Sequence, residues 1–334
     1  MRRRGMWRCF AALCALVVAG CDDTEVVTAD GGHGHDAASQ EDADTGSDGS
    51  ASMDSSVPWD GTSPTPATTG WEHTGVTLEA YSGPATITAD NTVIDGKDIT
   101  KCLVINAKNV TIKRSRIKCA SDYGILQNNG ATGLLVEDTE ITSTVTGSVN
   151  TMVDRAVQLN GGGANLQGLY IHDTIRGVWL ASNTTVEDSY IADNFVPEDA
   201  CGGGCPHTTA IVSFGTAHHV VIRHNTLKAV PVATAALALE GDFGSAEDGV
   251  SDDYLIDGNL LATAGGFAFY ADGSNLTFIN NKFSTEYEEN GGIYGHTLAW
   301  GTPSYGVDPG ELVWDNNTWY DPGGDKDGEI VPEP

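Results

Sequence analysis

Residues 220–227 read VVIRHNTL, and this short stretch decides the fold. It starts with the period-two alternation of a strand, since Val220 and Ile222 point to one side. Asn225 then marks a turn, because asparagine tolerates left-handed backbone and bonds to nearby backbone groups. Leu227 closes the unit. The pattern is an apolar residue, two variable residues, Asn, Ser, Thr or a similar residue, one variable residue, and a second apolar residue.

Copies of this pattern recur along the chain at irregular intervals. Ile171 begins a weaker copy, because Arg176 stands where the closing apolar residue belongs. A fixed local pattern with variable spacing predicts coils of similar shape joined by loops of different length. The clear copies run over residues 94–99, 112–117, 136–141, 186–191, 222–227, 256–261, 278–283 and 314–319.

A second short apolar strand precedes most copies, often after a small residue, as where Gly177 leads into Val178-Trp179-Leu180. Two or three strands per coil, stacked in parallel, predict an all-β right-handed parallel β-helix over residues 69–334. The solenoid is single-stranded, with about nine coils and a length of ~40 Å at ~4.8 Å per coil. Stacked turns would align the asparagines into a ladder. Tight two-residue hairpin turns do not link the copies, which argues against a β-sandwich.

The N-terminus reads as an export signal followed by a tether. Residues 1–20 carry four arginines before an apolar stretch that is short for a membrane helix, and they end at a sequence resembling a lipobox before Cys21. We therefore expect lipidation of Cys21 and an exported protein anchored to the bacterial cell envelope. A plain secretory signal is the alternative. Residues 21–68 are predicted to form a disordered acidic linker, with eleven Asp or Glu in 22–60 and no Lys or Arg.

The charge excludes some partners. The whole chain has a net charge of −29, and removal of residues 1–20 with their four arginines leaves −33. Such a surface repels nucleic acid and anionic lipid headgroups, so we expect no nucleic-acid partner and membrane contact through the lipid alone. A polyanionic ligand would need local arginines or lysines, or a bridging cation.

Four cysteines remain after export, and an even number in an exported chain predicts disulfides. Cys102 lies eight residues after Ile94, and Cys119 lies seven after Ile112, so both occupy nearly the same place on adjacent coils. A separation of ~4.8 Å between neighbouring strands allows a bond. We expect the pairs Cys102–Cys119 and Cys201–Cys205. Zinc is the rival, but the spacing lacks two CxxC units.

The stretches GVWLASNTTVEDSYIADNF, CPHTTAIVSFGTAHHVVIRHNTL and GGFAFYADGSNLTFINNKFS resemble the exported bacterial right-handed parallel β-helix repeat proteins. The resemblance covers roughly Thr74 to Asp321 and is distantly like polysaccharide lyases. It implies the fold and, through lyases and glycoside hydrolases of that fold, a carbohydrate ligand. Two motifs depart from the family. Thr209 and Val212 stand where the family often has Asp and Gln, and Ala192 stands where it often has His.

One predicted stripe has the residue types of a uronic-acid site. Arg155 and Arg176 lead into neighbouring second strands and should share a face, where arginine clamps a carboxylate. Trp179 would offer a stacking surface. Tyr190 and His207 are the candidates for proton transfer. The alternative is that Arg155 pairs with Asp154 or Asp173 and the tryptophan only packs.

Two further groups have a functional and a plain interpretation. The residues that follow each first apolar position should form an outward stripe of alternating charge, either a sugar-binding face that includes His172 or simple surface pairing. The acidic residues Glu240, Asp242, Asp252 and Asp253 would hold calcium or merely solvate a loop. Calcium is therefore the one cofactor considered, and no other is expected. The outward stripe contains Lys113, Glu137, His172, Glu187, Arg223 and Asp257.

Two function classes stay open. The first is a surface enzyme of polysaccharide-lyase type that acts on acidic glycans. The second is a non-catalytic envelope module that binds glycan, adheres or has a structural role. The missing family Asp and His favour the second, whereas the arginine pair with Trp179 favours the first or simple glycan binding. We expect a monomer with a polysaccharide partner.

The lipobox makes a direct prediction. The change Cys21→Ala should move the protein from the membrane fraction to the soluble fraction, because the acyl chains supply the membrane affinity. Fractionation with immunoblotting measures this, with Cys14→Ala as the matched control. Membrane retention of Cys21→Ala would contradict lipidation.

Overall fold

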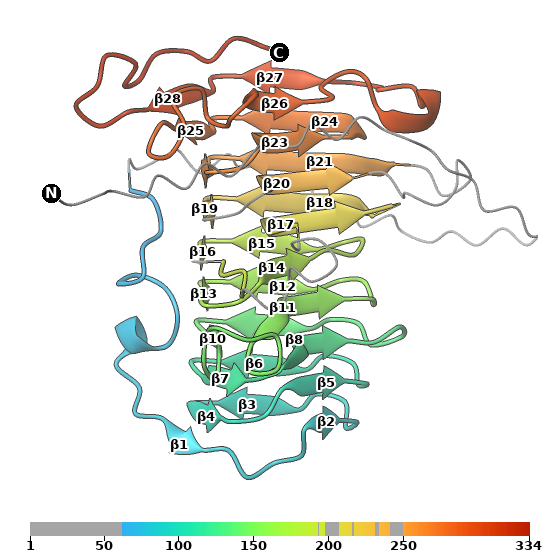
Figure 1. The fold of residues 1–334 in the computed structure, drawn as a ribbon. Coiled ribbons are helices and arrows are strands. Elements are labelled where there is room, and N and C mark those ends of the chain that lie inside the picture. The colour runs from blue at the N-terminus through green and yellow to red at the C-terminus, as the bar shows by residue number, and fades with distance from the viewer. Residues whose placement is uncertain (1–61, 193, 198–206, 216, 231–233, 241–249) are drawn as a thin grey trace, which may run out of the picture. The chain divides into compact units, whose positions relative to one another are not determined.

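The computed structural model describes residues 62–192, 194–197, 207–215, 217–230, 234–240 and 250–334. These residues form the predicted right-handed parallel β-helix, in which three parallel sheets make the three sides of a stack (Figure 1). Each full coil passes through sheet C, then sheet A, then sheet B before it enters the next coil. Each coil therefore has three strands, and its interior is shared by all three sheets.

The strands of the described residues are short and fall into the three sheets as follows. Sheet A contains β1 (Glu79–Ala80), β4 (Lys97–Ile99), β7 (Arg116–Cys119), β10 (Glu140–Ser143), β13 (Tyr170–Ile171), β16 (Tyr190–Ile191), β19 (Thr226–Ala229), β22 (Leu260–Thr263), β25 (Lys282–Ser284) and β28 (Thr318–Tyr320). Sheet B contains β2 (Thr86–Ile87), β5 (Leu103–Ile105), β8 (Ser121–Gln127), β11 (Val153–Leu159), β14 (Arg176–Trp179), β17 (Thr209–Phe214), β20 (Ala235–Glu240), β23 (Phe267–Ala271) and β26 (Gly295–Leu298). Sheet C contains β3 (Val93–Asp95), β6 (Thr111–Lys113), β9 (Leu135–Glu137), β12 (Asn165–Gln167), β15 (Thr185–Glu187), β18 (His218–Arg223), β21 (Ser251–Asp257), β24 (Gly273–Ile279) and β27 (Val313–Asp315). Two short 3₁₀ helices, η1 (Glu72–Thr74) and η3 (Ser304–Gly306), lie outside the sheets.

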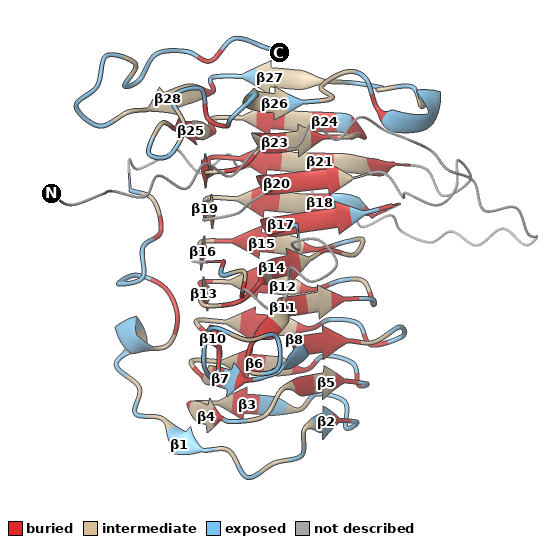
Figure 2. Ribbon diagram, in the orientation of Figure 1, coloured by how far each residue is buried: buried red, intermediate tan, exposed pale blue. Residues whose placement is uncertain are grey.

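The predicted interior row is confirmed in sheet C, where the first apolar residues of successive copies pair in register. Figure 2 shows how burial follows the strands of the stack. One copy was misplaced. Leu166 belongs to the row, between Val136 and Val186, and Ile171 closes this copy instead of beginning one. Leu169 occupies the position of the usual Asn, Ser or Thr, which hid the copy. The row runs through Ile94, Ile112, Val136, Leu166, Val186, Ile222, Ile256, Phe278 and Trp314.

The asparagine ladder exists, but the asparagines are not the left-handed residues. In the last four coils, each ladder side chain accepts a hydrogen bond from the backbone amide of the equivalent residue one coil earlier, at 2.9–3.0 Å. The residue just before the ladder position adopts the left-handed conformation, as His224 does at φ 50°. The ladder residue instead turns its amide inward, where Asn225 and Asn259 are fully buried. The ladder consists of Asn225, Asn259, Asn281 and Asn317.

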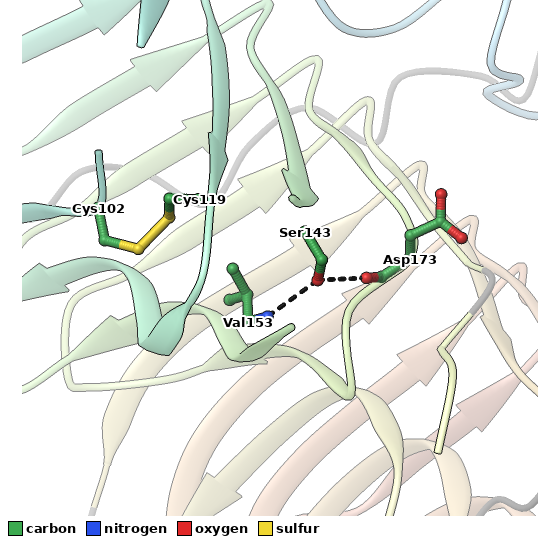
Figure 3. The surroundings of a disulfide bond; sticks show 5 residues. All are labelled: Cys102, Cys119, Ser143, Val153 and Asp173. Carbon is green, nitrogen blue, oxygen red and sulfur yellow. Dashed lines mark hydrogen bonds between the residues drawn. A yellow bond between two sulfur atoms is a disulfide. The ribbon is translucent and has the colours of Figure 1, made fainter. Parts of the chain in front are cut away.

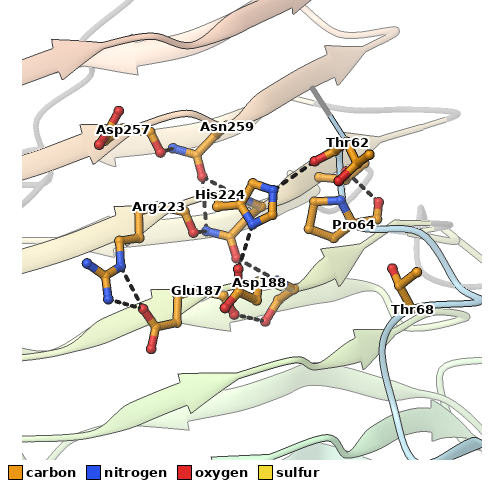
Figure 4. Close-up of polar contacts among 12 residues, drawn as sticks. Thr62, Pro64, Thr68, Glu187, Asp188, Arg223, His224, Asp257 and Asn259 are labelled. Carbon is orange, nitrogen blue, oxygen red and sulfur yellow. Dashed lines mark hydrogen bonds and ion pairs between the residues drawn. The ribbon is translucent and has the colours of Figure 1, made fainter. Parts of the chain in front are cut away.

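Residues 62–75 form a strap across the outside of the stack, although 62–68 were predicted to belong to the linker. His224 donates from Nε2 to the Thr62 carbonyl at 2.8 Å, and Thr226 donates to the Pro64 carbonyl at 2.7 Å (Figure 4). Further along, Gly70 donates to the carbonyl of Gly168 at 2.8 Å. The strap therefore follows the edge between sheets C and A from the sixth coil down towards β1.

The first predicted disulfide is present. Cys102, just before β5, is bonded to Cys119 at the end of β7, with the two Cα atoms 5.4 Å apart (Figure 3). Beside it, the Ser143 hydroxyl donates to the Asp173 carbonyl at 2.5 Å and accepts from the Val153 amide at 2.9 Å. Cys201 and Cys205 lie outside the described residues, as do the signal segment and Cys21.

The C-terminal end of the stack is covered by the chain itself. Val331 is fully buried, and its carbonyl accepts a hydrogen bond from the Trp314 indole at 3.0 Å. The interior rings of Phe278, Phe283 and Trp314 stack beneath it, with centroids 4.8–5.9 Å apart. A covered end keeps the last coil from exposing its apolar interior. Within the described part of the chain, no helix has the length and apolar character needed to cross a membrane.

The ladder predicts a large stability cost at one position. Asn259→Ala removes the acceptor of the Asn225 amide and the donor to the Ile222 carbonyl, leaving buried polar groups unpaired. At ~1–3 kcal/mol for each such group, we expect a loss of about 2–4 kcal/mol in the free energy of unfolding. Urea denaturation followed by circular dichroism measures it.

The matched control is Asn128→Ala, which removes one exposed side-chain bond to Asn106. Its loss should stay below about 1 kcal/mol. Equal losses in both variants would show that the ladder adds nothing beyond a surface hydrogen bond.

Candidate functional site

The outward face of sheet B brings the predicted arginines together. Arg155 on β11 and Arg176 on β14 are direct partners across adjacent parallel strands. The same register places Tyr123 on the preceding strand beside Arg155. A second outward row, three residues further along each strand, pairs Gln158 with Trp179. Parallel strands set these pairs about 4.8 Å apart, so the sheet itself fixes the two guanidinium groups side by side.

The two arginines share one carboxylate. Arg176 pairs through Nη1 with Asp154 Oδ1, and Arg155 Nε lies 3.3 Å from Asp154 Oδ2. Arg155 also donates from Nη1 to Gln158 at 2.5 Å, and Arg176 donates from Nε to the His207 carbonyl at 2.9 Å. Two guanidinium groups and one carboxylate leave a local charge of +1. Among the described residues, neither Nη2 group has an acceptor.

Trp179 is part of this arrangement, but its indole ring already contacts two other side chains. The Arg155 guanidinium lies 4.2 Å from the ring centroid, and the Phe214 ring lies 4.8 Å away. Trp179 also packs against a small outward cluster of Val212, Ala235 and Ala238. The cation–π contact orients Arg155, so Trp179 acts on the site by holding the guanidinium.

The remaining predicted site residues divide between two sheets. His207 precedes β17 and contributes its carbonyl to Arg176, while its side chain is exposed. Tyr190 lies on β16 of sheet A, where its ring meets the Tyr170 ring edge-on at 5.9 Å. Since Tyr190 belongs to a different side of the stack, the structure does not bring it to the arginine pair.

His172 does not belong to the outward stripe of sheet C. Gln167 occupies that place, because Leu166 is the interior residue of this coil. His172 follows β13 and contacts Glu140 at 3.2 Å and Asp173 at 2.8 Å. Elsewhere the stripe shows pairing of charged side chains between neighbouring coils, with Arg223 donating to Glu187 at 2.6 Å and Lys113 lying 3.8 Å from Asp95.

The acidic residues considered for calcium are spread over two sheets. Glu240 ends β20 of sheet B, whereas Asp252 and Asp253 belong to β21 of sheet C. Asp252 accepts hydrogen bonds from Ser274 and Asn275, and Asp253 pairs with His219. Within the described ranges, no group of three metal-binding side chains comes together. Asp242 lies outside these ranges.

Sequence reasoning missed a second set of residues on the same face. Phe267 and Tyr270 project outward from β23, and Tyr294 lies beside Phe267 just before β26. Glu240 is the last residue of β20, and Asp272 follows the end of its paired neighbour β23. Strand alternation did not reveal them, because a strict period of two would place Phe267 and Phe269 on the same face, whereas Ala268 and Phe269 are both buried in the interior.

No protein-family model and no curated protein matches this chain. Among solved structures, it is similar to the Dettilon tailspike protein, with 17% identity and a TM-score of 0.40 over 72% of this chain and 55% of that one. A mutant tailspike protein of E. coli bacteriophage HK620 is 16% identical in sequence, with a TM-score of 0.42 over 69% of this chain and 48% of that one. Tailspike protein gp49 of Acinetobacter baumannii bacteriophage Fri1, a capsular polysaccharide depolymerase, is 8% identical, with a TM-score of 0.35 over 78% of this chain and 63% of that one.

The chain thus spans about half the length of the first two of these tailspike proteins. Likeness at this level carries no information about what any face of the present stack binds. The candidate site is therefore judged on its own residues.

The surroundings of His172 predict a pH-dependent stability. Burial disfavours the charged ring, but hydrogen bonds to Glu140 and Asp173 and their negative charges outweigh it, so the pKa of His172 is raised. The raised pKa means that the folded state binds this proton more tightly than the unfolded chain does. The stabilisation is complete below about pH 6.5, the ordinary value for histidine, and is lost as the pH rises through the folded pKa.

As the pH rises from about 6.5 through the raised pKa of His172, we expect the urea midpoint of the wild type to fall. The midpoint of His172→Gln should fall less. The control is His207→Gln, which alters an exposed ring. A pH profile of His172→Gln that coincides with that of the wild type would rule out this contribution.

Proposed function

We propose that this protein is an exported envelope lipoprotein, anchored at Cys21, whose sheet B binds acidic polysaccharide on its outward face. The observation that carries the proposal is the in-register pair Arg155 and Arg176. Their Nη2 groups lack acceptors among the described residues, and their side chains are 26% and 20% exposed. A uronate carboxylate would accept hydrogen bonds from both groups at once.

Electrostatics supports an anionic ligand at this place. A surface with a charge of −33 after export repels polyanions in general, so an acidic glycan needs a local reversal of sign. The arginine pair supplies a charge of +1 even after Asp154 is counted. Asp154 also pre-orients both guanidinium groups, which lowers the entropy lost when a ligand binds.

Binding without elimination is the form of the proposal that the geometry favours. A lyase needs a proton acceptor beside the uronate carboxylate. Tyr190, the candidate for that role, lies on sheet A, and the arginines lie on sheet B. We therefore propose a glycan-binding module first and keep lyase chemistry as the second candidate, supported by His207 at the edge of the arginine pair.

The test compares binding of polygalacturonate and alginate by the wild type and by Arg155→Ala with Arg176→Ala. Charge-assisted hydrogen bonds are worth ~1.5–3 kcal/mol each, so the double change should weaken binding at least about tenfold. Isothermal titration calorimetry measures the affinity, and absorbance of unsaturated products in the same samples reports elimination.

The matched control is Arg116→Ala with Arg223→Ala, which removes the same charge from sheets A and C. It should leave binding nearly unchanged. An equal loss in both double variants would mean that net charge alone attracts the glycan. A wild type that binds neither polymer, with or without calcium, would refute the proposal.

A further inference from the structure

The missed aromatic residues form a partly exposed platform near the C-terminal end of sheet B. The Phe267 ring lies 5.6 Å from the Tyr270 ring and 5.9 Å from the Tyr294 ring, measured between centroids. Tyr294 is 73% exposed, and Leu298 beside Tyr270 in the register is 42% exposed. Rings of this size are normally buried in a soluble protein. Here Tyr294 is exposed and Phe267 and Tyr270 are half-buried beside it, which indicates a contact surface.

Two carboxylates border this platform in different environments. Asp272 accepts hydrogen bonds from the amide and the hydroxyl of Ser304, both at 2.6 Å. Among the described residues, no hydrogen bond or ion pair reaches the Glu240 carboxylate. Burial raises the pKa of Glu240, and the charge of Asp272 raises it further. An incoming hydroxyl group would therefore meet an acceptor that nothing else in the described structure engages.

The platform and the carboxylates belong to one surface. Burial raises the pKa of Tyr270, and the nearby acidic groups of Glu240 and Tyr294 add to the shift. Tyr270 also packs on one side of the outward cluster Val212, Ala235 and Ala238, and Trp179 packs against the same cluster. The aromatic platform thus lies on the outward side of the same sheet as the arginine pair, three strands further along the stack from β14.

We infer a second subsite, formed by Phe267, Tyr270, Tyr294, Glu240 and Asp272, that binds a neutral sugar ring of the same glycan. This inference rests on the proposed function and specifies its ligand as a polysaccharide with both acidic and neutral sugars. A pyranose ring has an apolar C–H face for the aromatic rings and hydroxyl donors for the carboxylates. Two adjacent carboxylates repel a uronate, so the two subsites select different sugars.

The experiment uses the full exported chain and three probes: oligogalacturonate, a neutral cello-oligosaccharide, and gellan fragments that contain both glucuronate and neutral sugars. The wild type should bind gellan fragments about tenfold more tightly than oligogalacturonate of equal length. Tyr294→Ala should remove most of this advantage without altering oligogalacturonate binding. Glu240→Gln keeps the size of the side chain and should act in the same direction. The matched control is Tyr287→Ala, which removes another exposed tyrosine, next to Lys228 of sheet A.

The outcomes separate the two proposals. Loss of oligogalacturonate binding in the arginine double variant alone supports the acidic subsite, whatever the tyrosine variants do. Binding of the cello-oligosaccharide that falls in Tyr294→Ala supports the neutral subsite even if no uronate binds. The inference is overturned if gellan fragments bind no better than oligogalacturonate, or if Tyr294→Ala and Tyr287→Ala behave alike. A chitosan oligomer serves as a cationic fourth probe. If it binds more tightly than the cello-oligosaccharide and the gellan fragments, the assignment to a neutral sugar is overturned.

Discussion

The structure depends on a backbone constraint at the two ends of each strand of sheet C. In eight successive coils, a residue with positive φ lies three positions before the interior residue, and another lies two positions after it. Ile222, for example, stands between His219 and His224, at φ 56° and 50°. Left-handed residues turn the chain sharply at little cost when they are Gly, Asn or Asp. Because both turns recur at fixed distances, every coil keeps the same corner while its other loops vary in length.

This constraint explains which parts of the fold the sequence predicted. The interior row and the parallel stack follow from the apolar spacing, which survives differences in loop length. The copy at Leu166 was missed because Leu169 replaces the polar ladder residue, although Gly163 and Gly168 keep both left-handed positions. Of the two reasons given for the ladder, bonding to nearby backbone is confirmed and tolerance of the left-handed conformation is wrong. The tolerance for positive φ belongs to His224 or Gly258, and Asn225 or Asn259 serves through its buried amide.

The candidate site was predictable only where residues at equivalent positions of successive coils must lie on the same face of the stack. Arg155 and Arg176 precede second strands by the same distance, so their register followed from the repeat. His172 and Tyr190 were assigned without knowing where sheet C ends and sheet A begins, which depends on the corner. The contact between Arg155 and Trp179 joins two outward rows, and no spacing rule predicts which faces of a ring remain free. The outward direction of Phe267 and Tyr270 does not follow from the sequence, because they are three residues apart and a strand alternates with a period of two.

The strap also determines how the molecule responds to a mechanical load. A pull applied at Thr62 enters on the flank of the sixth coil, at the edge opposite sheet B. The hydrogen bonds of the strap to His224, Thr226 and Gly168 would break one after another before tension reached β1 and the first coil. The stack would stay intact during this peeling, and the freed strap would add length between the load and the solenoid. Sheet B, on the far side, bears none of that force.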